Sequence, residues 1–494
     1  MTPYTFRSRA AILAALTGLA LAGSACSTDP VSNLNGIKVG YTHDVYLERL
    51  GGVLWIEKFD AATRTNMFDS FARAAANFVV TDSRSITEWL GDGSDIEAST
   101  FYSTANWQFQ FTSIRNAQAL LTDLPKANPA YSPGDIAKWK GIIYTLEALS
   151  YMYAELTKDT LGTPVTAPLV SNPSLPAPIL CSRDTWQFIV ALLDSGLTQL
   201  NADPSAGLPV ALDRGFAAVR AQASPSTTAG SFAAFNRALA ARANLELAYA
   251  IARSPGGTPP TATSAGAPDA NALNRADSAL HATALYSTTI APAVAGEFTD
   301  PLAVYNSFSG ASGDIANPVQ GIIPTYYLLN EAVAVIDPAD KRLVKLMTNP
   351  SGTAATTFNA KASPLTFSMY PNATSPVPII RNEELHLYGA QIRLGLNDLA
   401  GAVAEINQVR TQVGGLPPFV NPGTYVGVRN QILTEFMAST SGEPAGDRSA
   451  AIRDYGLPLV ADTTWGARDT HATVEPFTST DVTARNGNTK YICP

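Results

Sequence analysis

Residues 381–415, RNEELHLYGAQIRLGLNDLAGAVAEINQVRTQVGG, carry the most specific structural signal of the chain. The stretch is typical of two helices, 383–395 and 398–414, that follow each other closely enough to form a pair. This spacing is compatible with a tetratricopeptide-like hairpin of about 34 residues, in which stacked pairs bury a shared face. Small residues stand where the two helices must approach closely: Ala390, Gly395, Ala400, Ala402 and Ala404.

Helical periodicity covers most of the remaining chain. Ser132-Pro133 begins a helix over 133–160 with proline in its first turn, and Gly162 with Pro164 ends it. The other predicted helices are 103–124, 184–200, 231–253, 274–286, 325–335, 381–396, 398–413 and 426–437. Because only short β-like pieces such as 365–370 interrupt this pattern, the sequence predicts a mainly α fold.

Long irregular stretches separate the helices. Residues 254–268 are rich in Gly, Pro and Thr, and residues 297–323 and 349–378 are equally devoid of helical pattern. Loops of this length in a compact protein are usually functional or mobile. No composition break is sharp enough to divide the body, so we expect one helical domain over residues 37–494.

The N-terminus is predicted to be an export signal, residues 1–25. Arg7 and Arg9 precede an apolar run over 10–22, which is too short to span a membrane. The following Ser24-Ala25-Cys26 resembles the end of a bacterial lipobox, with Gly23 in place of the usual Leu. Two outcomes stay open: lipidation of Cys26, with residues 26–36 as a polar tether, or ordinary cleavage after Ala25.

Composition limits the partners and cofactors. The 494 residues are 15% charged and carry a net charge of −8, which argues against nucleic acid as a partner. Four His and three Cys leave little material for a transition-metal site, so we expect no metal and no cofactor. In an exported protein, Cys181 and Cys493 are candidates for a disulfide that would fix the C-terminus; two free buried thiols are the alternative.

Catalytic motifs are absent from the sequence. It contains no Gly-x-Ser-x-Gly elbow, no His-Glu-x-x-His, no Gly-Lys pair for a phosphate loop and no Cys-x-x-Cys. The adjacent acids Glu383 and Glu384 point to different sides of a helix, which makes them poor partners in catalysis. We therefore predict no catalytic residue and a protein that is not an enzyme.

Aromatic residues in loops are the other chemical resource. Exposed aromatic rings stack on sugar rings, and neighbouring amides and carboxylates orient the hydroxyl groups. The alternative is that each ring is a core anchor, as we expect for Trp107 on its helical stripe, and that the acidic loop is a solvated turn. The predicted ligand-binding residues are Trp89, Asp92, Asp95, Tyr102, Tyr305 and Asn306.

Four segments of the chain resemble the SusD/RagB family of outer-membrane nutrient-binding lipoproteins. They are 107–121 (WQFQFTSIRNAQALL), 138–164 (KWKGIIYTLEALSYMYAELTKDTLGTP), 381–415, and 432–456. The third is the most specific, with Glu384, Leu387, Gly395, Ala402, Asn407, Arg410 and Gly414 in the matching places. The fourth has Glu435, Gly446, Arg448, Arg453 and Gly456 in its matching places, with Phe436 where the family has Arg.

The resemblance implies a SusD-like fold of tetratricopeptide-type hairpins with a loop-rich binding face. It also implies that Glu384, Asn407, Arg410 and Arg448 pair within and between helices rather than touch ligand. The implied function is a lipid-anchored, surface-facing outer-membrane protein that binds a nutrient, most often a glycan, and delivers it to a SusC-like TonB-dependent transporter. Two alternatives remain: a surface glycoside hydrolase, and a scaffold that binds only the transporter.

Overall fold

The computed structural model describes residues 43–79, 81–82, 84–90, 96–98, 101–127, 131–165, 176–203, 207–219, 231–294, 300–310, 314–352, 361–457 and 474–491. Most of these residues are helical, which confirms the predicted mainly α fold class. The signal segment 1–25, Cys26 and the tether 26–36 lie outside the described residues.

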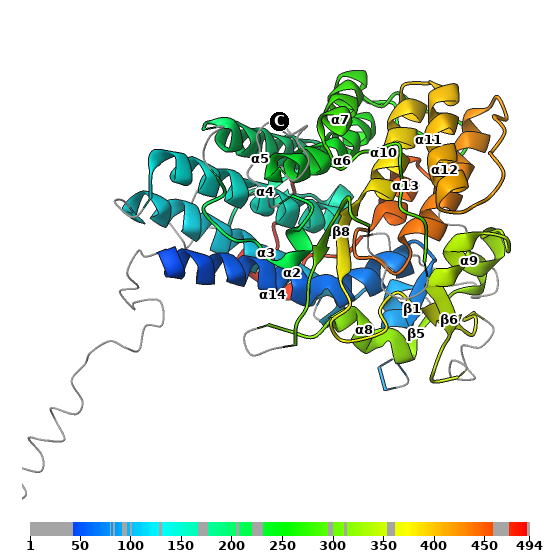
Figure 1. Ribbon diagram of the computed structural model, residues 1–494, viewed down its shortest axis with the longest axis horizontal. Helices are drawn as coiled ribbons and strands as arrows, with labels where there is room; N and C mark the ends of the chain where they lie inside the picture. Colours follow the sequence, from blue (N-terminus) through cyan, green and yellow to red (C-terminus); the bar gives the residue numbers. More distant parts are fainter. Residues whose placement is uncertain are drawn as a thin grey trace, which may run out of the picture.

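A row of helices, each packed against the next, forms the body of the molecule (Figure 1). The first part of the row is α3 (Phe101–Asp123), α4 (Pro133–Lys158), α5 (Ser182–Asn201), α6 (Phe232–Arg253) and α7 (Ala270–Ala282). The second part packs on α7 and comprises α10 (Asn382–Gly395), α11 (Leu399–Gln412), α12 (Tyr425–Thr440) and α13 (Asp447–Asp454). The observed bounds lie within four residues of most predicted ones, because capping residues and periodicity mark these helices clearly.

Helix α4 illustrates how local sequence sets these bounds. The Ser132 hydroxyl accepts a hydrogen bond from the backbone N–H of Asp135, 3.1 Å away, and the Asp135 carboxylate accepts one from the N–H of Ser132. This capping box satisfies two N–H groups that have no partner in the helix. At the other end Gly162 adopts a positive φ of 79°, which glycine tolerates without steric cost.

The predicted α10–α11 hairpin is confirmed. Ala390 and Ala402 are fully buried, as expected for residues at a close helix crossing. The motif residues pair structurally: Asn407 brackets the backbone of Phe419, and the Arg410 guanidinium lies 3.3 Å from the Glu435 carboxylate. These contacts agree with the structural role that the family resemblance implies.

Helix α2 (His43–Phe71) is the largest element that the sequence analysis missed. Its second half is buried on nearly all sides and includes charged and polar residues such as Glu57, Asp60 and Arg64. A helix buried all round shows no single apolar stripe, so its periodicity is hidden. The shorter helices α8 (Pro318–Ile322) and α14 (Ser479–Ala484), and α13, were also not predicted.

The structure contains four two-stranded antiparallel sheets in its described part. The pairs are β1 (Ala75–Asn77) with β5 (Tyr326–Leu328), β2 (Thr163–Pro164) with β3 (Ile179–Leu180), β4 (Ala303–Asn306) with β8 (Val377–Arg381), and β6 (Leu346–Thr348) with β7 (Leu365–Phe367). Strands β1, β5, β6 and β8 lie near α8 and α9 (Asn330–Val335), whereas the β2–β3 pair packs against α4 and α5. The helix predicted over 325–335 is wrong in its first part, because residues 326–328 pair with a strand instead.

Cys181, the residue before α5, is disulfide-bonded. Cys493 lies outside the described residues, so its pairing with Cys181 stays a prediction. Tyr491, two residues earlier, lines a small cavity together with Cys181. Among the helices of the described ranges, none is long and apolar enough to cross a membrane.

The crossing of α4 and α5 depends on two glycines. A Cβ atom at Gly141 would lie 2.5 Å from Cγ of Leu200 and 2.9 Å from the carbonyl oxygen of Gly196. We therefore expect Gly141→Ala to destabilise the protein by about 1–3 kcal/mol through overpacking, although alanine favours helix. Urea unfolding measures this. Gly321→Ala, where a Cβ would meet nothing within 4 Å, is the control and should leave stability unchanged or higher; equal stabilities of the two variants would contradict the tight crossing.

Candidate functional site

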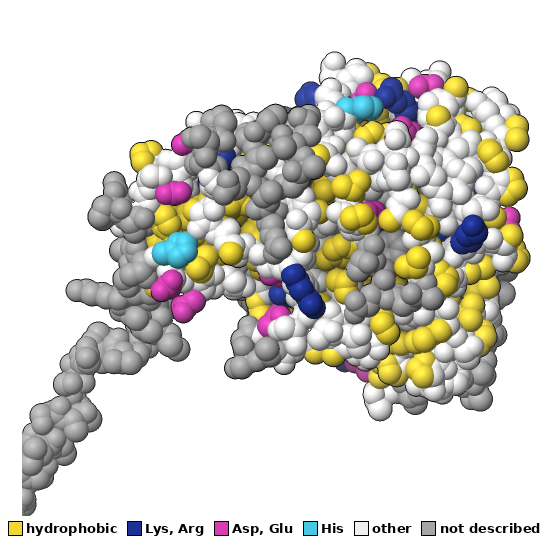
Figure 2. Space-filling model, viewed as in Figure 1, with side chains coloured by type: hydrophobic (Ala, Val, Ile, Leu, Met, Phe, Trp, Pro, Cys, Tyr) yellow, Lys and Arg dark blue, Asp and Glu magenta, His cyan; other side chains and the backbone are white. Residues whose placement is uncertain are grey.

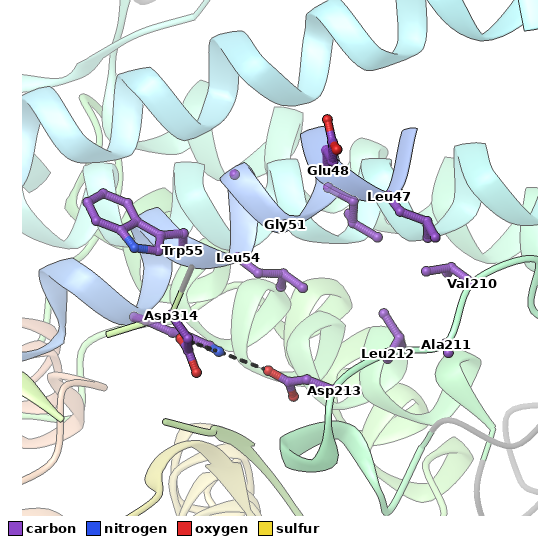
Figure 3. Close-up of a pocket in the computed structure, with 13 residues that line it drawn as sticks. Leu47, Glu48, Gly51, Leu54, Trp55, Val210, Ala211, Leu212, Asp213 and Asp314 are labelled. Carbon is purple, nitrogen blue, oxygen red and sulfur yellow. Dashed lines mark hydrogen bonds and ion pairs between the residues drawn. The ribbon is translucent and has the colours of Figure 1, made fainter. Parts of the chain in front are cut away.

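An open groove of about 560 Å³ lies between α2 and the segment 210–213 (Figure 3). Ligand-binding clefts in proteins commonly have volumes of 300–1,000 Å³, so this groove is large enough for a small oligomeric ligand. Leu47, Leu54, Val210 and Leu212 supply apolar surface, and polar side chains gather at one end. We call this cleft the α2 groove.

Trp55 is the aromatic residue of the groove. Its side chain is 38% exposed and stacks on Phe59, one helical turn later and 41% exposed, with ring centroids 4.9 Å apart and planes 13° apart. Phe109 of α3 meets Phe59 edge to face at 5.0 Å. Because its neighbours fix the indole, little side-chain entropy would be lost when a ligand packs on it.

Two consecutive glycines of α2 line the groove beside Trp55. A Cβ atom at Gly51 or at Gly52 would meet nothing within 4 Å, so no packing contact requires glycine at either position. Each glycine inside a helix costs about 0.5–1 kcal/mol relative to alanine. The two glycines leave the groove wider, because larger side chains at these positions would project into its open space.

Lys58 holds the polar end of the groove together. Its ammonium lies 3.1 Å from Asp213 and 3.3 Å from Asp314, so it links α2 to two separate loops. Burial raises the pKa of Asp314, but hydrogen bonds from the Ile315 N–H and the Ser309 hydroxyl, with the Lys58 charge, lower it below the ordinary value on balance. Asp314 is therefore a stable carboxylate that accepts hydrogen bonds.

Three of the predicted ligand residues have described side chains, and the structure separates them from the α2 groove. Trp89 is 1% exposed and belongs to the main core, so we correct its predicted stacking role: no face of the indole is free. Asn306 is also buried, with its amide 3.5 Å from Glu57, and we correct it in the same way. Tyr305 is 7% exposed in β4 and lines a different, smaller cavity.

The remaining predictions stay open. Asp92 and Asp95 lie outside the described residues, and of Tyr102 only the backbone, within α3, is described. The sequence analysis missed Trp55, Lys58 and Asp213. The sequence feature that could have indicated this site is the pair Gly51-Gly52, which ends three residues before Trp55. Glycines inside a helix reduce its stability, and packing does not explain these two.

Comparison with known proteins finds likeness in structure alone. No family model and no curated protein matches the sequence. A SusD superfamily protein from Bacteroides thetaiotaomicron superposes with a TM-score of 0.66 at 13% identity, covering 90% of this chain and 98% of that one. A SusD-like carbohydrate binding protein from Bacteroides vulgatus gives a TM-score of 0.66 at 12% identity, covering 91% of this chain and 98% of that one.

A third similar structure was determined with a xylogluco-oligosaccharide. It superposes with a TM-score of 0.56 at 13% identity and covers 84% of this chain and 83% of that one. At this level of identity, the likeness establishes the fold. The helical row, the small antiparallel sheets and the near-complete coverage of the neighbours lead to one conclusion: this chain has the fold of the SusD superfamily.

Proposed function

We propose that this protein binds a glycan in the α2 groove. The observation that supports this most is the exposed Trp55, held by its stack on Phe59, which lines an open cleft whose other walls carry apolar and hydrogen-bonding groups. A sugar ring presents an apolar face that packs on an indole, and hydroxyl groups around its rim. Asp213, Asp314 and Glu48 are positioned along the groove to accept hydrogen bonds from such hydroxyls.

The fold adds support for a glycan over other ligands. Among the similar structures are a SusD-like carbohydrate binding protein and one solved with a xylogluco-oligosaccharide. We infer that this chain likewise captures a nutrient glycan and passes it to a SusC-like TonB-dependent transporter. In this proposal Cys26 carries the lipid anchor that holds the protein at the outer surface of the outer membrane.

The groove favours binding over hydrolysis. A glycoside hydrolase needs one carboxylic acid that keeps its proton to protonate the leaving oxygen, and a second carboxylate across the cleft. Asp213 and Asp314 are instead both paired with Lys58, and the pKa of Asp314 is lowered by its hydrogen bonds and by the lysine charge despite the opposing effect of burial. This arrangement suits carboxylates that accept hydrogen bonds and do not transfer protons.

Removal of the indole tests the proposal directly. Trp55→Ala should weaken the binding of oligosaccharides about tenfold, because one stacking contact contributes on the order of 1 kcal/mol beyond its buried area. The melting temperature should change little, because Trp55 is partly exposed. Titration calorimetry with a xylogluco-oligosaccharide and with ligands found on a glycan array measures the affinity.

Two controls accompany this variant. Trp55→Phe keeps an aromatic face and should retain most of the affinity, and Tyr491→Ala removes an aromatic ring that is 47% exposed outside the groove. If the purified protein binds no glycan on the array, the proposal fails and the scaffold alternative is favoured. Release of shortened oligosaccharides by the wild-type protein would instead support the hydrolase.

The glycines of α2 provide a test with opposite signs for stability and binding. Gly51→Ala should raise the free energy of unfolding by about 0.5–1 kcal/mol, because alanine is the better helix former and has space there. The same methyl group should reduce glycan affinity by narrowing the groove. Gly321→Ala, a helical glycine in open space outside the groove, should leave affinity unchanged; loss of affinity in both variants would refute the explanation.

The anchor is tested separately. Cys26→Ser removes the proposed site of lipidation and should therefore move the exported protein from the membrane fraction to the soluble fraction. Because one acyl chain binds membranes only marginally, stable anchoring through Cys26 needs several chains. Fractionation with immunodetection, and mass spectrometry of the mature N-terminus, measure this. A soluble wild-type protein that begins at an unmodified Cys26, or at a residue before it, would contradict lipidation.

A further inference from the structure

A second cavity of about 340 Å³ lies across the segment 210–218 from the α2 groove. Asp213 of this segment lines the groove, whereas the next residue, Arg214, lines the second cavity together with Asp300 and Tyr305. The segment is therefore a narrow divider between two ligand-sized spaces. We call this space the Arg214 cavity.

The segment 210–218 packs closely against the wall of the Arg214 cavity. A Cβ atom at Gly215 would overlap the carbonyl oxygen of Tyr305, so the divider packs directly on the backbone of β4. The Tyr305 hydroxyl accepts a hydrogen bond from the N–H of Asp300, which fixes the loop that precedes β4. Asp213 caps the turn Arg214–Phe216 by accepting from the N–H of Gly215, 2.9 Å away.

Arg214 carries a charge that no acidic side chain of the described part of the protein neutralises. Its Nη2 donates to the carbonyl oxygens of Phe308 at 2.8 Å and Thr374 at 3.3 Å, and these neutral acceptors hold the guanidinium at the cavity. In the α2 groove, by contrast, the Lys58 ammonium already pairs with two carboxylates. Nε and Nη1 donate no hydrogen bond to any described residue, and the side chain is exposed, so these hydrogens are available to a ligand.

Asp300 is the acidic residue of the same wall, and it is placed differently from the acids of the groove. Its Oδ1 accepts from the N–H of Leu302 at 2.8 Å, and its buried Oδ2 has no hydrogen-bond partner. Burial raises the pKa of this carboxyl, although the Leu302 hydrogen bond and the Arg381 charge oppose the shift. Asp300 thus places a carboxyl in the wall whose Oδ2 is buried beneath the cavity surface, and Ser307 lies in the same wall.

We propose that the Arg214 cavity binds a carboxylate-bearing sugar, a uronic acid, as a second subsite for the glycan proposed to lie in the α2 groove. The unpaired guanidinium selects an anion, since charge-assisted hydrogen bonds to carboxylates are about twice as strong as neutral ones. Ser307 and Thr374, which line the same cavity, suit the hydroxyl groups of the same ring. The nearby Asp300 carboxyl favours a singly charged carboxylate over a doubly charged phosphate. This inference rests on the proposed glycan function and specifies its substrate class.

Saturation-transfer NMR with the mature protein tests the proposal, using D-glucuronate and D-glucose as observed ligands and inorganic phosphate, which has no carbon-bound protons, as a competitor. D-glucuronate should bind more tightly than the other two, and its affinity should fall as sodium chloride is raised, because salt screens the Arg214 charge. Arg214→Gln should weaken D-glucuronate binding roughly tenfold, the effect of losing one charge-assisted hydrogen bond. Lys490→Gln, which removes an exposed positive charge elsewhere, is the matched control.

A second variant distinguishes a loss of D-glucuronate binding from a folding defect. Arg214→Lys keeps the positive charge and should retain a measurable preference for D-glucuronate, even if both variants lose the contacts to Phe308 and Thr374 and melt earlier. Unchanged D-glucuronate affinity in Arg214→Gln, or D-glucose or phosphate binding as tight as D-glucuronate, would overturn the proposal.

The two proposals fail in different ways. If neutral oligosaccharides bind through Trp55 but D-glucuronate does not bind through Arg214, only the acidic subsite is wrong. If neither class of sugar binds at all, the proposed glycan function itself is wrong, and the subsite falls with it.

Discussion

The buried ion pair between Arg64 and Glu57 defines the inward face of α2, and the rest of the proposed site depends on that helix. Both guanidinium Nη atoms contact the Glu57 carboxylate, at 2.7 and 2.6 Å, and the guanidinium lies 3.8 Å from the ring centre of Tyr153 on α4. Arg64 and Glu57 both belong to α2, so contacts to other elements set the rotation of the helix: Asp60 accepts a hydrogen bond from the Gln110 amide of α3 at 2.7 Å, and Asp69 accepts one from the Tyr326 hydroxyl of β5. At 100° per residue, Trp55 and Phe59 then lie on the side of α2 opposite the ion pair, facing solvent. The packing of this buried polar face against its neighbours thus determines which aromatic rings are exposed.

The low content of charged residues also shapes the surface. Only 15% of the residues are charged, and buried pairs such as Arg381 with Glu443 and Arg342 with Glu435 remove several of these from the surface. On the face shown in Figure 2, charged side chains are few and scattered among neutral and apolar groups. A ligand with many hydroxyls and little charge matches such a surface through stacking and hydrogen bonds. Within the described part of the protein Arg214 has no acidic partner, and it lines a ligand-sized cavity; for these two reasons together we assign it a role in ligand selection.

Much of the fold could be predicted from the sequence, because local signals and tertiary demands agree there. Helix α4 has its capping box and terminal glycine, and the α10–α11 hairpin has Ala390 and Ala402 buried as predicted, although the predicted crossing residues Ala400 and Ala404 are exposed. Prediction failed where tertiary contacts override local pattern. Buried polar residues conceal α2, and strand pairing with β1 converts residues 326–328 from the predicted helix into β5. For the site, a position in a predicted loop does not imply exposure: Trp89 is a core residue. The exposed Trp55 lies instead in α2, the helix that the sequence did not reveal.

The central claim, that the α2 groove receives a glycan on Trp55, is tested most directly by ¹⁹F NMR of protein labelled with 5-fluorotryptophan. Of the six tryptophans, Trp55 is accessible, four are buried (Trp89, Trp107, Trp139 and Trp186), and Trp465 lies outside the described residues, so a ligand in the groove should affect the Trp55 resonance selectively among the five described ones. The Trp55 signal is identified by its loss in Trp55→Phe. On addition of a glycan that the protein binds, the account predicts a saturable shift of the Trp55 resonance with the four buried signals unchanged. Saturable binding that leaves the Trp55 resonance in place would contradict it.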